Sequence, residues 1–296
     1  MLTPSTACQA MMKRDRISMG LALAFAISLG TAWAKNYQTV QITPAHLGGM
    51  TVNFNVILPA NYEKSSRRFP VLYLLHGYTG HYSDWVEHTR IVEYAQGYAE
   101  IIVMPEGENS WYTNNVAHPE LRWEDYIILD LIPYVDGHLR TLPVRASRAI
   151  AGLSMGGYGA MKLGLQYPQT FAAVASLSGV LASAQAKWYE SIRDGDLKKI
   201  ITDDFGPPEN PSHAANDPFL LVWKVPPGEM PQLYFSIGSS DHLLQENRDF
   251  ATLLARLNIR CRYCEVPGRH EWPVWDRQIR RVLAVQAPRI GATLVR

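Results

Sequence analysis

Short apolar runs alternate with amphipathic segments along most of the chain, and this alternation restricts the possible folds more than any other feature of the sequence. Runs this short, and apolar on both faces, are typical of strands in a parallel sheet that is covered on both sides. They lie at residues 69–75, 101–104, 149–153, 173–177, 232–237 and 260–266. Two earlier runs, 37–43 and 51–58, are joined through Gly48-Gly49 and predict a leading antiparallel pair.

The segments between these runs have the spacing of helices that bury one face. They lie at residues 89–98, 124–139, 155–166, 243–257 and 272–285. Pro133 falls inside the second segment and should kink or break that helix, because proline lacks the N–H that a helix interior uses. Strands and helices that alternate in this way predict an α/β fold, with a mostly parallel, doubly wound sheet and helices on both of its faces.

Residues 182–231 interrupt this alternation. The segment begins like a helix and then carries prolines at positions 207, 208, 211, 218, 226, 227 and 231. Long insertions of this kind are usually lids or functional loops. We therefore expect a cap insertion over the carboxyl edge of the sheet. The alternative is a surface excursion that has no role.

The amino-terminal segment has the order of an export signal. A basic cluster of Lys13, Arg14 and Arg16 precedes an apolar run at 17–30, and Ala32-Trp33-Ala34 then matches a signal peptidase site. The run is shorter than the roughly 20 residues of a spanning helix, which argues against a stable membrane anchor. The sequence thus predicts a signal peptide at 1–34, a single catalytic domain at 35–296, and a periplasmic or secreted protein.

Charge and cysteine content exclude several kinds of partner. The chain has a formal net charge of +1 and no basic run after the cluster at residues 13–16, so nothing indicates nucleic acid binding. Cys261 and Cys264 lie three apart in a predicted strand, where they face opposite sides and cannot form a disulfide. We expect two free thiols, at least one of them buried. No further ligands stand near them for a metal ion.

The segment Gly152-Leu153-Ser154-Met155-Gly156 lies between a predicted strand and a predicted helix. Gly152 and Gly156, two residues before and two residues after Ser154, leave room for a tight strand-to-helix turn. This turn would present the Ser154 hydroxyl at the carboxyl edge of the sheet. The helix behind it favours negative charge at that point. Ser154 is therefore the candidate nucleophile. The alternative is a glycine-rich helix start that is capped by a serine.

A second motif, His76-Gly77-Tyr78, ends the run at 69–75. In a fold with such a serine turn, the loop after this strand supplies one backbone N–H to the oxyanion hole, and the residue after the nucleophile supplies the other. Those two groups would be the N–H of Tyr78 and the N–H of Met155. They must point at the oxygen on which negative charge develops in the transition state.

Asp241 follows a late predicted strand, and His270 follows the last one. Asp241 could hold one nitrogen of His270 so that the other accepts the proton of Ser154. The chain order Ser, Asp, His is the order that this arrangement requires. Asp241 could instead be a helix N-cap, and Glu246 and Glu265 are weaker candidates for the acid.

These motifs resemble the esterase D-like family of α/β-hydrolases, and most closely its tributyrin esterase and S-formylglutathione hydrolase-like bacterial carboxylesterases. The resemblance extends over about residues 50–285. The matching segments are Val71-Leu72-Tyr73-Leu74-Leu75-His76-Gly77, Asn109-Ser110-Trp111-Tyr112-Thr113, Ala151-Gly152-Leu153-Ser154-Met155-Gly156-Gly157-Tyr158-Gly159, Gly238-Ser239-Ser240-Asp241 and Gly268-Arg269-His270-Glu271-Trp272-Pro273-Val274-Trp275. The resemblance implies the α/β-hydrolase fold, a Ser154–Asp241–His270 triad, no metal and no other cofactor.

The expected activity is that of an exported serine carboxylesterase, which hydrolyses short-chain acyl esters through an acyl-enzyme. The substrate would be a small-molecule or glycan-linked ester. Three alternatives stay open: an acyltransferase with the same triad, a polysaccharide acetyl or feruloyl esterase or siderophore esterase, and a binding protein without activity. Loop aromatics are candidates for the substrate pocket, unless they pack the cap onto the core: Tyr78, Trp111, Tyr112, Trp188 and Trp272.

Overall fold

The computed structural model describes residues 36–295. The predicted signal peptide, residues 1–34, lies outside this part of the chain. Among the described residues, none of the helices combines the length and the apolar character needed to cross a membrane.

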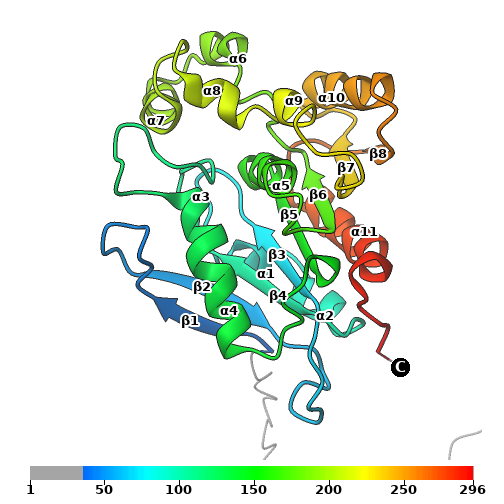
Figure 1. Ribbon diagram of the computed structural model, residues 1–296. Coiled ribbons are helices and arrows are strands. Elements are labelled where there is room, and N and C mark those ends of the chain that lie inside the picture. The colour runs from blue at the N-terminus through cyan, green and yellow to red at the C-terminus, as the bar shows by residue number, and fades with distance from the viewer. Residues whose placement is uncertain (1–35, 296) are drawn as a thin grey trace, which may run out of the picture. The chain divides into compact units, whose positions relative to one another are not determined.

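An eight-stranded sheet runs through the described residues, in the order β1-β2-β4-β3-β5-β6-β7-β8 (Figure 1). Only the pairs β1·β2 and β2·β4 are antiparallel, and all later pairs are parallel. This confirms the leading antiparallel pair and the mostly parallel sheet. The strands are β1 (Gln38–Ile42), β2 (Val52–Ile57), β3 (Val71–Leu75), β4 (Ile101–Pro105), β5 (Arg148–Leu153), β6 (Ala173–Leu177), β7 (Gln232–Gly238) and β8 (Cys261–Val266).

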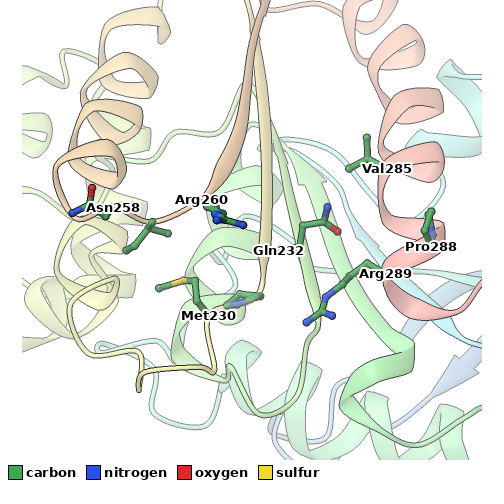
Figure 2. Close-up of a pocket in the computed structure, with 9 residues that line it drawn as sticks. Met230, Gln232, Asn258, Arg260, Val285, Pro288 and Arg289 are labelled. Atoms are coloured by element: carbon green, nitrogen blue, oxygen red, sulfur yellow. The ribbon is translucent and has the colours of Figure 1, made fainter.

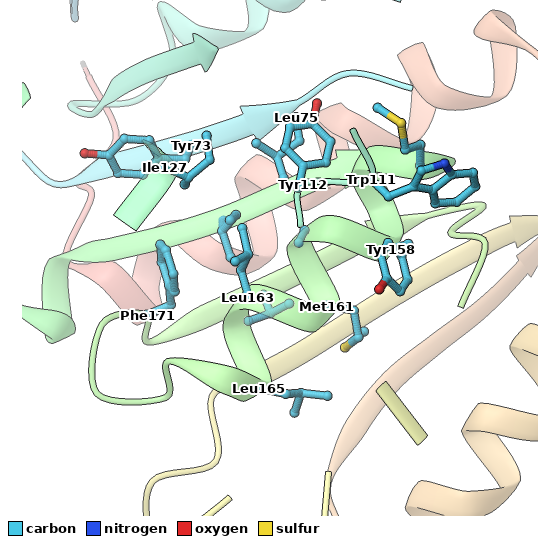
Figure 3. Close-up of a cluster of buried hydrophobic side chains, with 14 of the residues drawn as sticks. Tyr73, Leu75, Trp111, Tyr112, Ile127, Tyr158, Met161, Leu163, Leu165 and Phe171 are labelled. Carbon is cyan, nitrogen blue, oxygen red and sulfur yellow. The ribbon is translucent and has the colours of Figure 1, made fainter. Parts of the chain in front are cut away.

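Helices cover both faces of the sheet, as the alternation predicts. One face packs against α5 (Met155–Gln166), α10 (Leu244–Arg256) and the α3–α4 region, in a core that contains Tyr112, Tyr158 and Leu163 (Figure 3). The other packs against α1 (Asp84–His88), α2 (Ile91–Ala95) and α11 (Trp272–Ile290). Residues 155–165 of α5 are all buried, so the helix that follows Ser154 is fixed on every side.

Two predicted helices take a different form. Within the segment 89–98 only α2 (Ile91–Ala95) is helical, and α1 (Asp84–His88) precedes the segment. The two helices are separated at Thr89 and Arg90, where the N–H of Arg90 donates to Asp276 and that of Ile91 to the hydroxyl of Thr89. The segment 124–139 consists of α3 (Trp123–Asp125), a π-helix (Tyr126–Leu131) and α4 (Ile132–His138). The wider π turn stands immediately before Pro133, where a regular helix would clash with the proline ring.

The segment 182–231 is more helical than its prolines indicate. It forms α6 (Ala186–Ser191), α7 (Gly195–Phe205), α8 (Pro211–Asn216) and α9 (Pro218–Leu221). Asp194, Asn210 and Asp217 cap the last three with their side-chain oxygens, and prolines 211 and 218 occupy first turns, where no N–H is needed. Figure 1 shows α6, α7 and α8 gathered at one end of the molecule.

Cys261 and Cys264 are free thiols, as expected. Both are only partly buried, so the expectation that at least one is buried is wrong. The reason is the position of β8 at the edge of the sheet, where one side of the strand has no neighbour.

Candidate active site

Ser154 occupies a strained turn between β5 and α5. Its φ of 52° and ψ of −117° lie outside the regions that residues other than glycine usually adopt. A Cβ at Gly152 would stand 2.3 Å from the carbonyl oxygen of Gly156, and one at Gly156 would stand 2.4 Å from that of His76. Both positions therefore need glycine, because β3, β5 and α5 approach so closely there.

The structure brings the three predicted catalytic side chains together, although they come from three separate loops. The Nε2 atom of His270 lies 2.9 Å from the hydroxyl of Ser154. Its Nδ1 atom lies 3.0 Å and 3.2 Å from the two carboxylate oxygens of Asp241. Ser154 is 9% exposed and Asp241 is 5% exposed, so little water competes for these contacts.

Asp241 also caps the turn that leads into α10, since its Oδ1 accepts the N–H of Leu243 at 3.0 Å. The capping interpretation and the catalytic one are thus compatible. Burial alone would raise the pKa of Asp241, but its hydrogen bonds from His270 and Leu243 outweigh burial and lower that pKa. The carboxylate stays charged and can orient the imidazole.

The two predicted oxyanion donors flank Ser154. Met155 is the first residue of α5, and the first N–H groups of a helix have no acceptor within it. For the N–H of Tyr78, no acceptor is found among residues 36–295. The carbonyl of Gly77 belongs to the same peptide unit, and it lies 2.8 Å from Nδ1 of His76 and accepts the N–H of Gly80. The peptide unit between Gly77 and Tyr78 is therefore held in place through contacts of its carbonyl oxygen.

Glu106 anchors this loop, a role that sequence analysis missed. Its Oε1 lies 3.0 Å from Nε2 of His76 and accepts the N–H groups of Gly107 and Glu108. Burial would raise the pKa of Glu106, but these bonds outweigh it and lower the pKa to about 2. Glu106 directly follows strand β4, just as His76 directly follows strand β3. Because these two strands are parallel neighbours, their carboxyl ends meet, and this position in the sequence could have placed Glu106 near His76.

Two cavities meet at Ser154, His270 and Tyr78. The first has a volume of about 640 Å³ and mixes aromatic with polar side chains, namely Trp272, Trp275, His88, Asp84 and Glu271. The second has a volume of about 410 Å³ and is mainly apolar, lined by Trp111, Val180, Trp188, Ile192, Leu197 and Leu243. Of the pocket residues predicted from sequence, Trp272 thus lines the first cavity, Trp111 and Trp188 the second, and Tyr78 both.

Tyr112 lines neither cavity, contrary to expectation. Its side chain is fully buried, and its hydroxyl donates to the carbonyl of His76 at 3.0 Å. It therefore supports the loop after β3, which contains the predicted oxyanion donor Tyr78. Trp275 was missed as a site residue, although it belongs to the matching His270 motif: its ring meets that of His270 edge-on, with centroids 4.9 Å apart.

A larger cavity, of about 820 Å³, contains none of these residues. Figure 2 shows it between the carboxyl end of α11 and the loops that lead into β7 and β8, with Gln232, Arg260 and Arg289 on its walls.

These features define a serine hydrolase of the α/β-hydrolase class. They are a mostly parallel sheet, a strained serine just before a buried helix, and a histidine that contacts both this serine and a carboxylate. The chain belongs to the Esterase family, whose model matches residues 46–284. It is an esterase D-like, ester-hydrolysing enzyme.

Individual relatives are similar over most of the chain. The acetyl esterase of Caldicellulosiruptor saccharolyticus is 33% identical over 73% of this chain and 83% of its own length. The acyltransferase/mycolyltransferase Ag85C of Mycobacterium leprae is 26% identical over 70% of this chain and 71% of its own length. Other curated esterases are longer, and the matches span 55% of their length.

Among solved structures, FphF, a fluorophosphonate-binding serine hydrolase of Staphylococcus aureus, superposes with a TM-score of 0.75. It is 28% identical, and the match covers 84% of this chain and 97% of that one.

Proposed function

We propose that this protein is an exported carboxylesterase that hydrolyses short-chain acyl esters through Ser154, His270 and Asp241. The observation that carries the proposal is the continuous contact from the Ser154 hydroxyl through both nitrogens of His270 to the buried carboxylate of Asp241. The proton of Ser154 can pass to Nε2 of His270 without rearrangement of the side chains, and the carboxylate of Asp241 stabilises the imidazolium that forms.

Hydrolysis would proceed in two steps. His270 takes the proton of Ser154 as the hydroxyl attacks the ester carbonyl, and the N–H groups of Tyr78 and Met155 stabilise the oxyanion. His270 then gives the proton to the leaving alcohol. The alcohol departs, and the acyl group remains bound to Ser154 as an acyl-enzyme. Water repeats the sequence and releases the acid.

The two cavities suggest where the halves of the substrate bind. The apolar cavity is suited to the acyl chain, and its volume of about 410 Å³ limits chain length. The polar cavity offers carboxylates and indole rings to the alcohol. Trp188, Ile192 and Leu197 reach the apolar cavity from the segment 182–231, which supports the cap role proposed for that segment. Acetyl esterase activity in the Caldicellulosiruptor relative agrees with a short acyl group.

The proposal is tested with p-nitrophenyl esters from acetate to octanoate, assayed beside acetylated and feruloylated sugars. We expect the highest kcat/KM for the short acyl chains. Active enzyme should also lose its activity on labelling of Ser154 by a fluorophosphonate. Failure of this reagent to label Ser154 in folded protein would refute the assignment and favour a binding protein.

Transfer to an alcohol other than water is the second candidate, because the similarity to the Ag85C acyltransferase extends over 70% of this chain. The same acyl-enzyme would then react with an alcohol bound in the polar cavity. Product analysis with and without added sugar or glycerol separates the two. An acylated sugar as the main product, at the expense of free acid, would identify a transferase.

A further inference from the structure

A second imidazole stands next to the proposed catalytic pair of Asp241 and His270. His242 follows Asp241 directly, and its ring centroid lies 4.9 Å from that of His270. Its Nδ1 atom lies 3.5 Å from Oδ1 of Asp241, and that same oxygen lies 3.2 Å from Nδ1 of His270. The hydrolytic mechanism uses Asp241 and His270, whereas His242 lines the apolar cavity and takes no part in the proton transfers.

The three ligand atoms are close enough to bind one metal ion after a small movement of the two imidazoles. They lie within 4.8 Å of one another. In a tetrahedral zinc site with bonds of about 2.0–2.1 Å, neighbouring donor atoms are about 3.3 Å apart. Both histidine nitrogens already lie near that distance from Asp241, so only the two imidazoles have to approach each other. The side chain of His242 is 71% exposed and has room to turn toward His270.

We propose that Asp241, His242 and His270 form a binding site for zinc, or for another divalent ion that imidazole ligands favour, and that an ion bound there switches off hydrolysis. Two imidazoles and a carboxylate with a fourth, open position are a common zinc ligand set. Magnesium is excluded as the occupant because it prefers oxygen ligands in an octahedral arrangement.

Inhibition follows from where the proton of His270 is placed. As a base, His270 carries its proton on Nδ1, toward Asp241, and offers the lone pair of Nε2 to Ser154. A zinc ion that takes the lone pair of Nδ1 leaves the single proton of the neutral ring on Nε2. That nitrogen then has no lone pair for the proton of Ser154, and the nucleophile is not activated. The inhibition of hydrolysis depends on the proposed role of His270 as the base, whereas the binding of the ion does not depend on that role.

The test measures binding and activity separately. Equilibrium dialysis of the whole protein gives the number of zinc ions bound per chain, with magnesium as the control ion. Esterase rates are measured over a zinc titration and again after a chelator is added. Each variant is compared with its own zinc-free rate.

The informative variant is His242→Phe, which keeps a ring beside His270 and removes the ligand atom; His242→Gln serves as a second variant of different shape. His118→Phe is the matched control, because His118 is also exposed and lies 3.7 Å from the carboxylate of Glu120, and no group of three ligands includes it within residues 36–295. We expect one zinc ion per wild-type chain and inhibition that the chelator reverses. Both His242 variants should need at least about 100-fold more zinc for half-inhibition, since even partners outside the ligand set are worth about 10–100-fold in metal affinity.

Equal zinc inhibition of the wild type and both His242 variants would overturn the site, and so would a wild-type chain that binds no zinc. Zinc that binds through His242 while hydrolysis continues would support the site, overturn the inhibition and contradict the role of His270 as the base. The binding measurement also decides the matter if the chain proves to have no esterase activity, so the two proposals can fail independently.

Discussion

Glu106→Gln is the substitution that best tests how the oxyanion loop is held. Glu106 is 6% exposed, and its Oε1 lies within 3.0 Å of the imidazole of His76 and of two backbone nitrogens. Glutamine keeps the shape and one oxygen but removes the negative charge. The substitution therefore removes the electrostatic part of the interaction while it leaves the packing unchanged.

The magnitude follows from the lowered pKa of Glu106. A pKa of about 2 in the folded protein, against about 4.3 in an unfolded chain, corresponds to about 3 kcal/mol of stability at pH 7. Because the folded-state pKa is the lower one, this stabilisation is complete well above pH 4.3. It is lost as the pH falls from about 5 to about 2, and about half of it remains at pH 3.

We expect Glu106→Gln to lower the free energy of unfolding by about 2–3 kcal/mol at pH 7, measured by urea denaturation, and by about half as much at pH 3. Glu93→Gln is the control: Glu93 is 69% exposed and its contact with Arg90 is 3.9 Å long, so the change should stay within about 0.5 kcal/mol.

The same variant should affect catalysis through the peptide between Gly77 and Tyr78. If His76 no longer holds the Gly77 carbonyl, the N–H of Tyr78 loses its orientation. We expect kcat to fall with little change in KM, up to the limit of about 10²–10³-fold for loss of one oxyanion donor. A variant with wild-type stability at pH 7, or with a deficit that does not shrink toward pH 3, would refute the reasoning.

Three further predictions concern the nucleophile, the acyl cavity and a buried acid. Ser154→Ala should lower kcat by about 10⁴-fold or more and leave the circular dichroism spectrum unchanged; an active Ser154→Ala enzyme would contradict the assignment. Leu197→Trp should fill part of the apolar cavity and lower kcat/KM for octanoate more than for acetate, and equal losses would place the acyl chain elsewhere. Burial raises the pKa of Glu100 to about 8, so wild-type stability falls as the pH rises from about 4 to about 8. Glu100→Gln should therefore be the more stable protein at pH 8, by about 4–5 kcal/mol in urea denaturation, and an equal gain at pH 5 would exclude ionisation as the cause.

The fold could be predicted because its signal is local. Apolar runs of five or six residues between amphipathic segments indicate a parallel sheet wherever they occur, and the strands that form lie within a residue or two of those runs. Helix α5 has the predicted bounds for the same reason. Helix α1 lies before the predicted segment 89–98 and was missed. The break between α1 and α2 involves Asp276 on α11, almost two hundred positions away in the chain.

Residue types and their order were sufficient to nominate Ser154, Asp241 and His270, since parallel strands deliver their carboxyl ends to one edge of the sheet. The chain's own sequence could not separate Trp111, which reaches a cavity, from Tyr112, which is buried under the oxyanion loop. Both are aromatic residues in one loop with left-handed backbone angles, and only tertiary contacts, such as that of the Tyr112 hydroxyl with the His76 carbonyl, distinguish them.

The amino-acid sequence by itself determined the layered α/β architecture, the turn that presents Ser154 and the membership of an esterase family, because each depends on neighbours along the chain. Only the tertiary structure decided that Glu106 holds His76, that the segment 182–231 supplies a wall of the apolar cavity, and that His242 stands beside His270. These contacts join residues that are distant in sequence, and their strength comes from burial and charge, which exist only once the chain has packed.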